Sequence, residues 1–113
     1  EVCISLYLMR FSYTPEAWAR LIKNPEDRRK VAQEVIEKLG GKLQGFWYSF
    51  GQQDGVLLVE APNNISAAAF SVGISSAGSL AAAETTVLLS VEETIEMLKK
   101  AQTISYRPPG ASN

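Results

Sequence analysis

The chain has 113 residues, of which 46% are hydrophobic and 20% are charged, and this balance fits one compact globular domain. Its 11 lysines and arginines nearly equal its 12 aspartates and glutamates, so no basic excess is available to neutralise phosphates. We therefore expect no nucleic-acid partner. No apolar run approaches the roughly 18 residues that a membrane span needs, and the N-terminus lacks a signal-peptide pattern.

The counts of histidine and cysteine limit the kinds of catalytic and metal site that the chain can form. Histidine is absent, which removes His-based triads and the commonest protein ligand of zinc, copper and haem iron. The single cysteine, Cys3, cannot form an intrachain disulfide, which fits a reducing compartment. We therefore predict a cytoplasmic protein with no metal site and no cofactor.

In chain order, residues 2–11 are rich in Val, Ile, Leu, Tyr and Phe and predict a first strand. Thr14 followed by a proline is a typical helix start, because the threonine caps free amides and proline suits the first helical turn. A break near Pro25 precedes a second helical segment, which ends at Gly40 and Gly41.

Two further strands are expected at 42–50 and 55–61, joined by a link short enough for an antiparallel hairpin. A helix follows at 65–77, and its many alanines, glycines and serines predict close packing against its neighbours. A fourth strand is expected at 79–89.

Ser90 opens a last helix, because a serine followed three residues later by glutamate is a capping box. The apolar side chains of this helix, which we expect to face the body of the protein, are Val91, Ile95 and Leu98. We interpret residues 1–105 as one domain and 106–113, rich in proline and glycine, as a flexible tail.

This order of elements, βαββαβ with a C-terminal helix, predicts a ferredoxin-like α+β fold. Both connecting helices of such a fold cover one face of an antiparallel sheet and leave the other face bare. No predicted strand is half polar, although a sheet open to water normally alternates apolar and polar side chains. We therefore expect a second copy of the chain to cover the bare face, which predicts a homodimer or a larger homo-oligomer.

Three consecutive aromatic residues also indicate that the bare face of the sheet is covered. Phe46, Trp47 and Tyr48 lie in one predicted strand, where neighbouring side chains point to opposite faces. Of Trp47 and Tyr48, one is therefore expected in the core and the other on the open face, where an amphipathic ring suits a ligand or an interface.

Taken in order, several short segments resemble the GYD-domain family of small bacterial and archaeal proteins. They are Tyr13-Thr14-Pro15-Glu16, Arg28-Arg29, Gly40-Gly41-Lys42, Phe46 to Gly51 with Asp54, Pro62-Asn63, Ser76-Ala77-Gly78 and Leu88-Leu89-Ser90. The resemblance spans nearly the whole chain and implies a similarity to dimeric α/β-barrel proteins, and hence an α/β-barrel type oligomer. Where the family usually has an aromatic residue before its aspartate, this chain has Gln53.

The candidate functional residues follow from their chemistry and position. Those expected to bind a ligand are Tyr7, Tyr13, Arg28, Trp47, Tyr48 and Asp54, and those that could act in catalysis are Asp54, Glu84 and Tyr48. Each also has a structural explanation: Asp54 accepts amides at a turn, Arg28 pairs with Glu26 or Asp27, and Glu84 is solvated if its strand is an edge.

Three functions remain open from the sequence. The first is a regulatory or accessory protein that binds a small molecule in a cavity on the open sheet face. The second resembles the cofactor-independent oxygenases and isomerases of the α/β-barrel type, in which the substrate supplies the reactivity. The third is a structural assembly protein.

Overall fold

The computed structural model describes residues 4–110 and has four strands and four helices in that range. The expectations on Val2 and Cys3 lie outside the described residues. The strands are β1 (Ser5–Tyr13), β2 (Lys42–Tyr48), β3 (Gly55–Ala61) and β4 (Leu80–Leu88). The helices are α1 (Pro15–Lys23), α2 (Arg28–Lys38), α3 (Asn64–Ser75) and α4 (Val91–Ala101).

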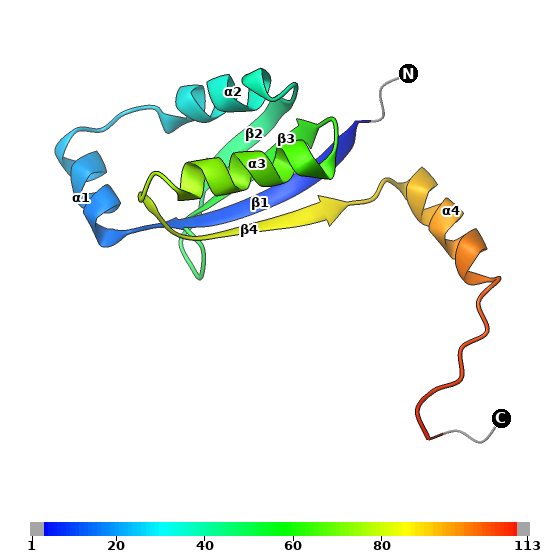
Figure 1. Ribbon diagram of the computed structural model, residues 1–113. Coiled ribbons are helices and arrows are strands. Elements are labelled where there is room, and N and C mark those ends of the chain that lie inside the picture. Colours follow the sequence, from blue (N-terminus) through cyan, green and yellow to red (C-terminus); the bar gives the residue numbers. More distant parts are fainter. Residues whose placement is uncertain (1–3, 111–113) are drawn as a thin grey trace.

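The four strands form one antiparallel sheet in the order β2-β3-β1-β4. Two crossover connections, one through α1 and α2 and the other through α3, place β1 and β3 in the middle of this sheet. Figure 1 shows α2 and α3 on the same side of the sheet. The expected ferredoxin-like α+β fold is thereby confirmed.

Local capping explains where the helices begin. The hydroxyl of Thr14 accepts a hydrogen bond from the backbone N–H of Ala17 at 3.1 Å, and proline occupies the first turn of α1. Asn63 caps α3 in the same way. At α4 the side chains of Ser90 and Glu93 form the predicted capping box.

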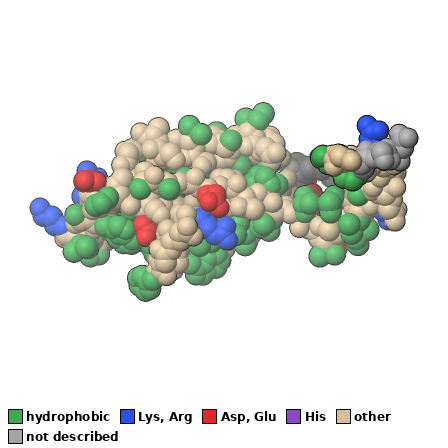
Figure 2. Space-filling model, turned by 90° about the horizontal axis from the view of Figure 1, so that it is seen from below, with side chains coloured by type: hydrophobic (Ala, Val, Ile, Leu, Met, Phe, Trp, Pro, Cys, Tyr) green, Lys and Arg blue, Asp and Glu red, His purple; other side chains and the backbone are tan. Residues whose placement is uncertain are grey.

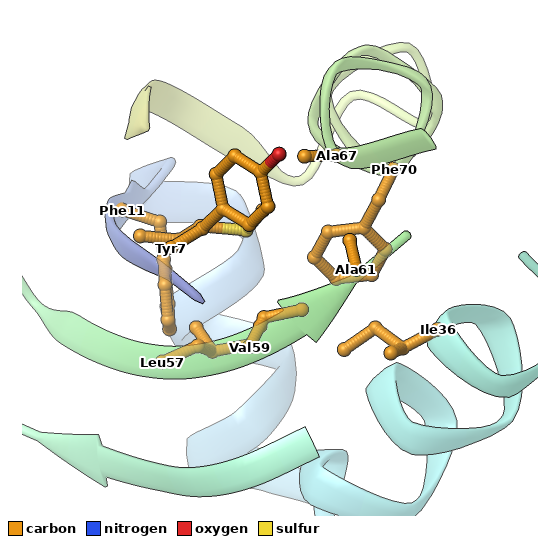
Figure 3. Close-up of a cluster of buried hydrophobic side chains, with 9 residues drawn as sticks. Tyr7, Phe11, Ile36, Leu57, Val59, Ala61, Ala67 and Phe70 are labelled. Atoms are coloured by element: carbon orange, nitrogen blue, oxygen red, sulfur yellow. The ribbon is translucent and has the colours of Figure 1, made fainter. Parts of the chain in front are cut away.

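The core lies between the sheet and the helices α2 and α3 (Figure 3). Its central side chains alternate along β1 and β3, and they are Tyr7, Met9, Phe11, Leu57, Val59 and Ala61. Ile36 from α2 and Phe70 from α3 close this layer from above. The period of two therefore buries one face of the sheet, which we call the covered face, and leaves the other, the open face, without helices.

The aromatic run of β2 divides between these faces. Tyr48 pairs with Gly55 opposite Phe11 and lies on the covered face, whereas Trp47 lies on the open face. They are 49% and 57% exposed, so the expectation that one of them belongs to the core is wrong: β2 is an edge strand, and its end extends beyond the helices. A glycine makes room for a ring on each face. A Cβ added at Gly55 would lie 2.2 Å from the ring of Phe11, and one added at Gly45 would lie 2.2 Å from the indole of Trp47.

Seen from the open side, hydrophobic side chains form separate patches on a surface that also carries charged groups (Figure 2). Leu6, Leu8 and Leu58 are only partly buried there, because no helix covers them. Arg10 and Glu84 form the ion pair between described residues on this face, at 4.0 Å. The strand register also places Lys42 and Glu60 on the open face, so this face is mixed, with apolar side chains beside charged ones.

The C-terminal helix departs from the prediction. We expect Val91, Ile95 and Leu98 to face the body, but they are 71%, 47% and 55% exposed, and α4 contains no buried residue. Figure 1 shows α4 standing clear of the sheet beyond the end of β4. The amphipathic pattern is present in the sequence, but no other helix or strand of the described residues buries its apolar stripe.

Candidate functional site

The main apolar hollow of the described residues lies between α2 and α3, above the covered face, and we call it the helix groove. It has a volume of about 430 Å³. Its lining is dominated by apolar side chains, among which are Val31, Val35, Phe46, Phe70, Ile74 and Leu80. This size and character are typical of a small-molecule site.

One end of the helix groove is polar, because Tyr13 and Arg28 both reach its lining. Partial burial, followed by the hydrogen bond with Tyr48, raises the pKa of Tyr13 above its ordinary value, and the nearby guanidinium of Arg28 opposes this shift. The phenol is therefore neutral at physiological pH and can donate a hydrogen bond. Arg28 itself pairs with Glu26 at 3.1 Å on the surface.

Behind this polar end, five aromatic side chains form a cluster that fixes the position of Tyr13. The members are Phe11, Tyr13, Trp18, Phe46 and Tyr48. Tyr13 meets Phe11 and Trp18 edge to face at centroid distances of 5.0 and 5.1 Å. Its hydroxyl lies 3.2 Å from that of Tyr48. Such pairs add packing energy and hold each ring in a defined orientation.

Asp54 anchors the same end of the sheet. Its Oδ2 accepts hydrogen bonds from the backbone N–H of Tyr13 at 2.9 Å and from the indole N–H of Trp18 at 3.1 Å. The Asp54 backbone N–H also donates to the carbonyl of Phe11 at 2.8 Å. The carboxylate therefore ties β1, α1 and the start of β3 together.

Glu84 occupies a different environment. It lies on β4, an edge strand, where its side chain is 62% exposed and faces Arg10 across the open face. The solvated alternative for this residue is thus the observed one. Arg10, Val56 and Glu84 line a shallow hollow of about 530 Å³ together with the β2–β3 loop.

The GYD domain family matches residues 7–98, most of the chain. The chain belongs to the GYD-domain family. The solved structure of MtbAldR (Rv2779c) resembles this GYD domain with a TM-score of 0.57 at 17% sequence identity. The match covers 77% of this chain and 54% of the other, so the GYD domain corresponds to about half of that protein's length, and the likeness concerns the fold. No curated protein matches the chain.

The GYD domain brings together four of the six residues expected to bind a ligand. Tyr13, Arg28, Tyr48 and Asp54 lie at the same end of the covered face. Tyr7 is instead buried further along β1, 1% exposed, and donates a hydrogen bond to Asn64 Oδ1 at 2.6 Å. Trp47 lies on the opposite face.

This arrangement corrects the expected location of the site. The sequence analysis assigns these residues to a cavity on the open face, but only Trp47 of the six lies there. The reason is the pairing of β2 with β3, whose register directs Tyr48 and Phe46 towards the helices. The alternation along a strand predicts two sets of side chains, but not which set the helices cover.

Several groove residues were not singled out from the sequence, among them Val31, Val35 and Ile74. Small side chains in α3 were expected to allow close packing, and Ala67 is indeed buried. Gly73, however, lines the helix groove, and a Cβ added there would meet no atom within 4 Å. The run of small residues thus leaves space on this part of α3, and it is the signal that could have indicated the groove.

Among the described residues, no helix is long and apolar enough to cross a membrane. Within the same range, no group of three or more Cys, Asp or Glu side chains is arranged to hold a metal ion. The polar side chains that line the helix groove are those of Tyr13, Arg28 and Ser79.

Proposed function

We propose that this GYD-domain protein binds a small molecule with an apolar body and an anionic end in the helix groove, in a regulatory or accessory role. The observation that carries the proposal is the polarity of the groove: apolar side chains line most of its length, and Tyr13 and Arg28 lie at one end. Its volume of about 430 Å³ suits a ligand of metabolite size.

Arg28 supplies the anion selectivity. A guanidinium matches a carboxylate or a phosphate through two parallel hydrogen bonds, and such pairs are stronger in a partly dry groove than at the surface. Its present partner, Glu26, is 48% exposed, so the pair contributes little and can be exchanged for a ligand. The neutral phenol of Tyr13 adds a hydrogen-bond donor.

Binding is favoured over catalysis by the state of the candidate bases. Proton abstraction needs a free base beside the substrate. The Asp54 Oδ2 atom already accepts two N–H donors, Glu84 lies on the other face, and the Tyr48 hydroxyl is hydrogen-bonded to that of Tyr13 at 3.2 Å. An oxygenase or isomerase would need one of these groups to be available in the groove.

The second part of the proposal is that the protein is a homo-oligomer, in which a second copy covers the open face. Trp47 is 57% exposed on this face, and the aromatic ring of Phe50 is fully exposed at the tip of the adjoining β2–β3 loop. Exposed apolar side chains of this kind are typical of a subunit interface and unfavourable in water.

The ligand proposal is tested by isothermal titration of the protein with decanoate, a carboxylate with an apolar chain, and with the uncharged decanamide. We expect decanoate to bind more tightly, and Arg28→Met to weaken decanoate by about tenfold while leaving decanamide unchanged, because only the carboxylate uses the guanidinium. Equal loss for both probes, or no binding of decanoate, contradicts the proposed ligand class.

Gly73→Phe tests the location of the site. The added ring extends into the helix groove from a position where nothing lies within 4 Å, so it should block decanoate without disturbing the fold. The matched control is Ile65→Phe, at a position of the same helix that is 81% exposed and outside the groove lining. If both variants bind decanoate like the wild type, the ligand does not occupy the helix groove.

A further inference from the structure

The helix α4 has an apolar stripe that its own chain does not cover. Val91, Ile95 and Leu98 recur at intervals of four and three residues, which places them on one side of the helix. None of them is buried. A helix of 11 residues is marginal in water on its own, so its stability in the protein depends on a surface against which this stripe packs.

The dimensions of the single chain also indicate apolar surface that the chain itself does not bury. Its radius of gyration is 18.3 Å, whereas a compact chain of this length has about 13 Å. Its accessible surface is 8380 Å², whereas a folded monomer of this mass exposes about 6,100 Å². The excess, roughly a quarter of the observed surface, includes the extended segment after α4 as well as the uncovered α4 and open face, and a dimer interface would bury surface of the latter kind.

A matching surface lies on the body, in a hollow of about 390 Å³ between α3 and β4, which we call the α3–β4 groove. Ala67, Ala68, Val72 and Val87 contribute its apolar lining, and none of its lining residues is charged. Val72 and Val87 are 68% and 51% exposed. The chain therefore carries both an uncovered apolar helix and an uncovered apolar groove.

We propose that α4 of one copy packs its apolar stripe into the α3–β4 groove of a second copy, and that the exchange is reciprocal. It rests on the proposed homo-oligomer and assigns a specific contact to it. In a twofold dimer, each copy offers the same pair of surfaces, so one type of contact covers both helices and both grooves. No other partner is needed to account for either surface.

The direction of the helix supports a contact between copies. Only Leu89 and Ser90 separate α4 from β4, and Figure 1 shows the helix leaving past the level of the sheet on the side away from α2 and α3. This is the side on which the open face lies. An 11-residue helix is about 16 Å long, which exceeds the roughly 10 Å between sheets packed face to face, so it reaches the flank of a second copy.

The charges of α4 are compatible with this contact. Glu92 and Glu93 lie in its first turn, and Lys99 and Lys100 lie in its last turn, where each pair complements the helix dipole. Lys100 and Glu96 project from the side opposite the stripe. Docking the stripe in the uncharged groove thus leaves these groups in water.

Cysteine crosslinking tests the contact directly. In a Cys3→Ser background, we mix a Val72→Cys protein with an Ile95→Cys protein and oxidise them. We expect a disulfide-linked heterodimer, because the two positions meet only between copies. The matched control replaces Ile95→Cys with Lys100→Cys, on the opposite side of α4, and should give at least tenfold less. An absent heterodimer, or one of equal yield with the control, overturns the proposal.

The Val72→Cys/Ile95→Cys double variant distinguishes exchange from folding back. A crosslinked monomer, rather than a crosslinked dimer, would mean that α4 covers the groove of its own chain, and this outcome also overturns the proposal.

Sedimentation equilibrium separates this proposal from the homo-oligomer itself. The full-length Ile95→Glu/Leu98→Glu variant should have a dissociation constant at least tenfold higher than the wild type, whereas Lys100→Gln should leave it unchanged. An unchanged dissociation constant in the double variant overturns the role of α4 and leaves the open-face interface intact. A monomeric wild type overturns both.

Discussion

Trp47 and Tyr48 are neighbours in the chain, yet they belong to two different surfaces of the protein. Tyr48 joins the aromatic cluster of the covered face, where Tyr13, Trp18, Phe46 and Phe11 surround it. Trp47 lies over Gly45 on the open face and has no aromatic ring of the described residues stacked on it. Helices of the chain itself cover one face, and we propose that a second copy covers the other.

This difference indicates that the two faces of the sheet have different roles. The covered face supplies the core and, at the polar end of the helix groove, a set of donors held in place by Asp54 and the aromatic cluster. The open face and α4 expose apolar side chains that are only partly buried within a single chain. Stability and assembly should therefore respond to mutations on different faces.

The largest expected effect is on the covered face. Phe70 is almost fully buried in the core, so Phe70→Ala should lower the free energy of unfolding by about 3–5 kcal/mol through lost burial and the cavity left behind. Urea denaturation measures this loss. Ile65→Ala, at an exposed position of the same helix, should change it by less than about 0.5 kcal/mol. Similar losses in both variants would contradict the position of the core.

A charge on the open face should act on assembly instead. Leu58→Asp places a carboxylate at the middle of the proposed interface and should raise the dissociation constant of the oligomer by about a hundredfold. Sedimentation velocity gives the change, and circular dichroism shows whether the fold is kept. Ala69→Asp, on the outside of α3, is the control. An oligomer unaffected by Leu58→Asp means that another surface holds the copies together.

Asp54 tests how β1, α1 and the start of β3 are held together at one end of the sheet. Asp54→Asn keeps the shape but removes the charge from the acceptor of Tyr13 and Trp18, so the free energy of unfolding should fall by about 1–2 kcal/mol. The indole fluorescence should shift as the acceptor of Trp18 changes from a charged to a neutral oxygen, while the oligomer is retained. Unchanged stability and emission would show that the carboxylate is not an anchor.

The smallest effect concerns pH. The pKa of Tyr13 is raised in the folded protein, so the stabilisation is fully present below the unfolded pKa of about 10 and is lost as the pH rises towards the folded value. Tyr13→Phe should therefore lose less stability than the wild type between about pH 9.5 and 11. Thermal melting across this range is the measurement, with Tyr106→Phe, an exposed residue near the C-terminus, as control. Parallel curves for all three proteins would contradict the burial of Tyr13.

Local features of the fold could be predicted from the sequence because they depend on neighbouring residues. The caps at Thr14, Asn63 and Ser90 and the bounds of β3 are where the pattern indicates. The helix groove could not be predicted, because it depends on how α2 and α3 sit above the sheet. Likewise, the stripe of α4 predicts that it packs against something, but not that the surface lies outside its own chain.

The central claim is that a second copy covers the open face, and native mass spectrometry of the gently purified protein tests it most directly. We predict a species of at least twice the 12.3 kDa of one chain, and we expect Gly73→Phe to keep that subunit count while losing any small-molecule adduct that the wild type carries. A wild type that remains a single chain at micromolar concentration would contradict the account.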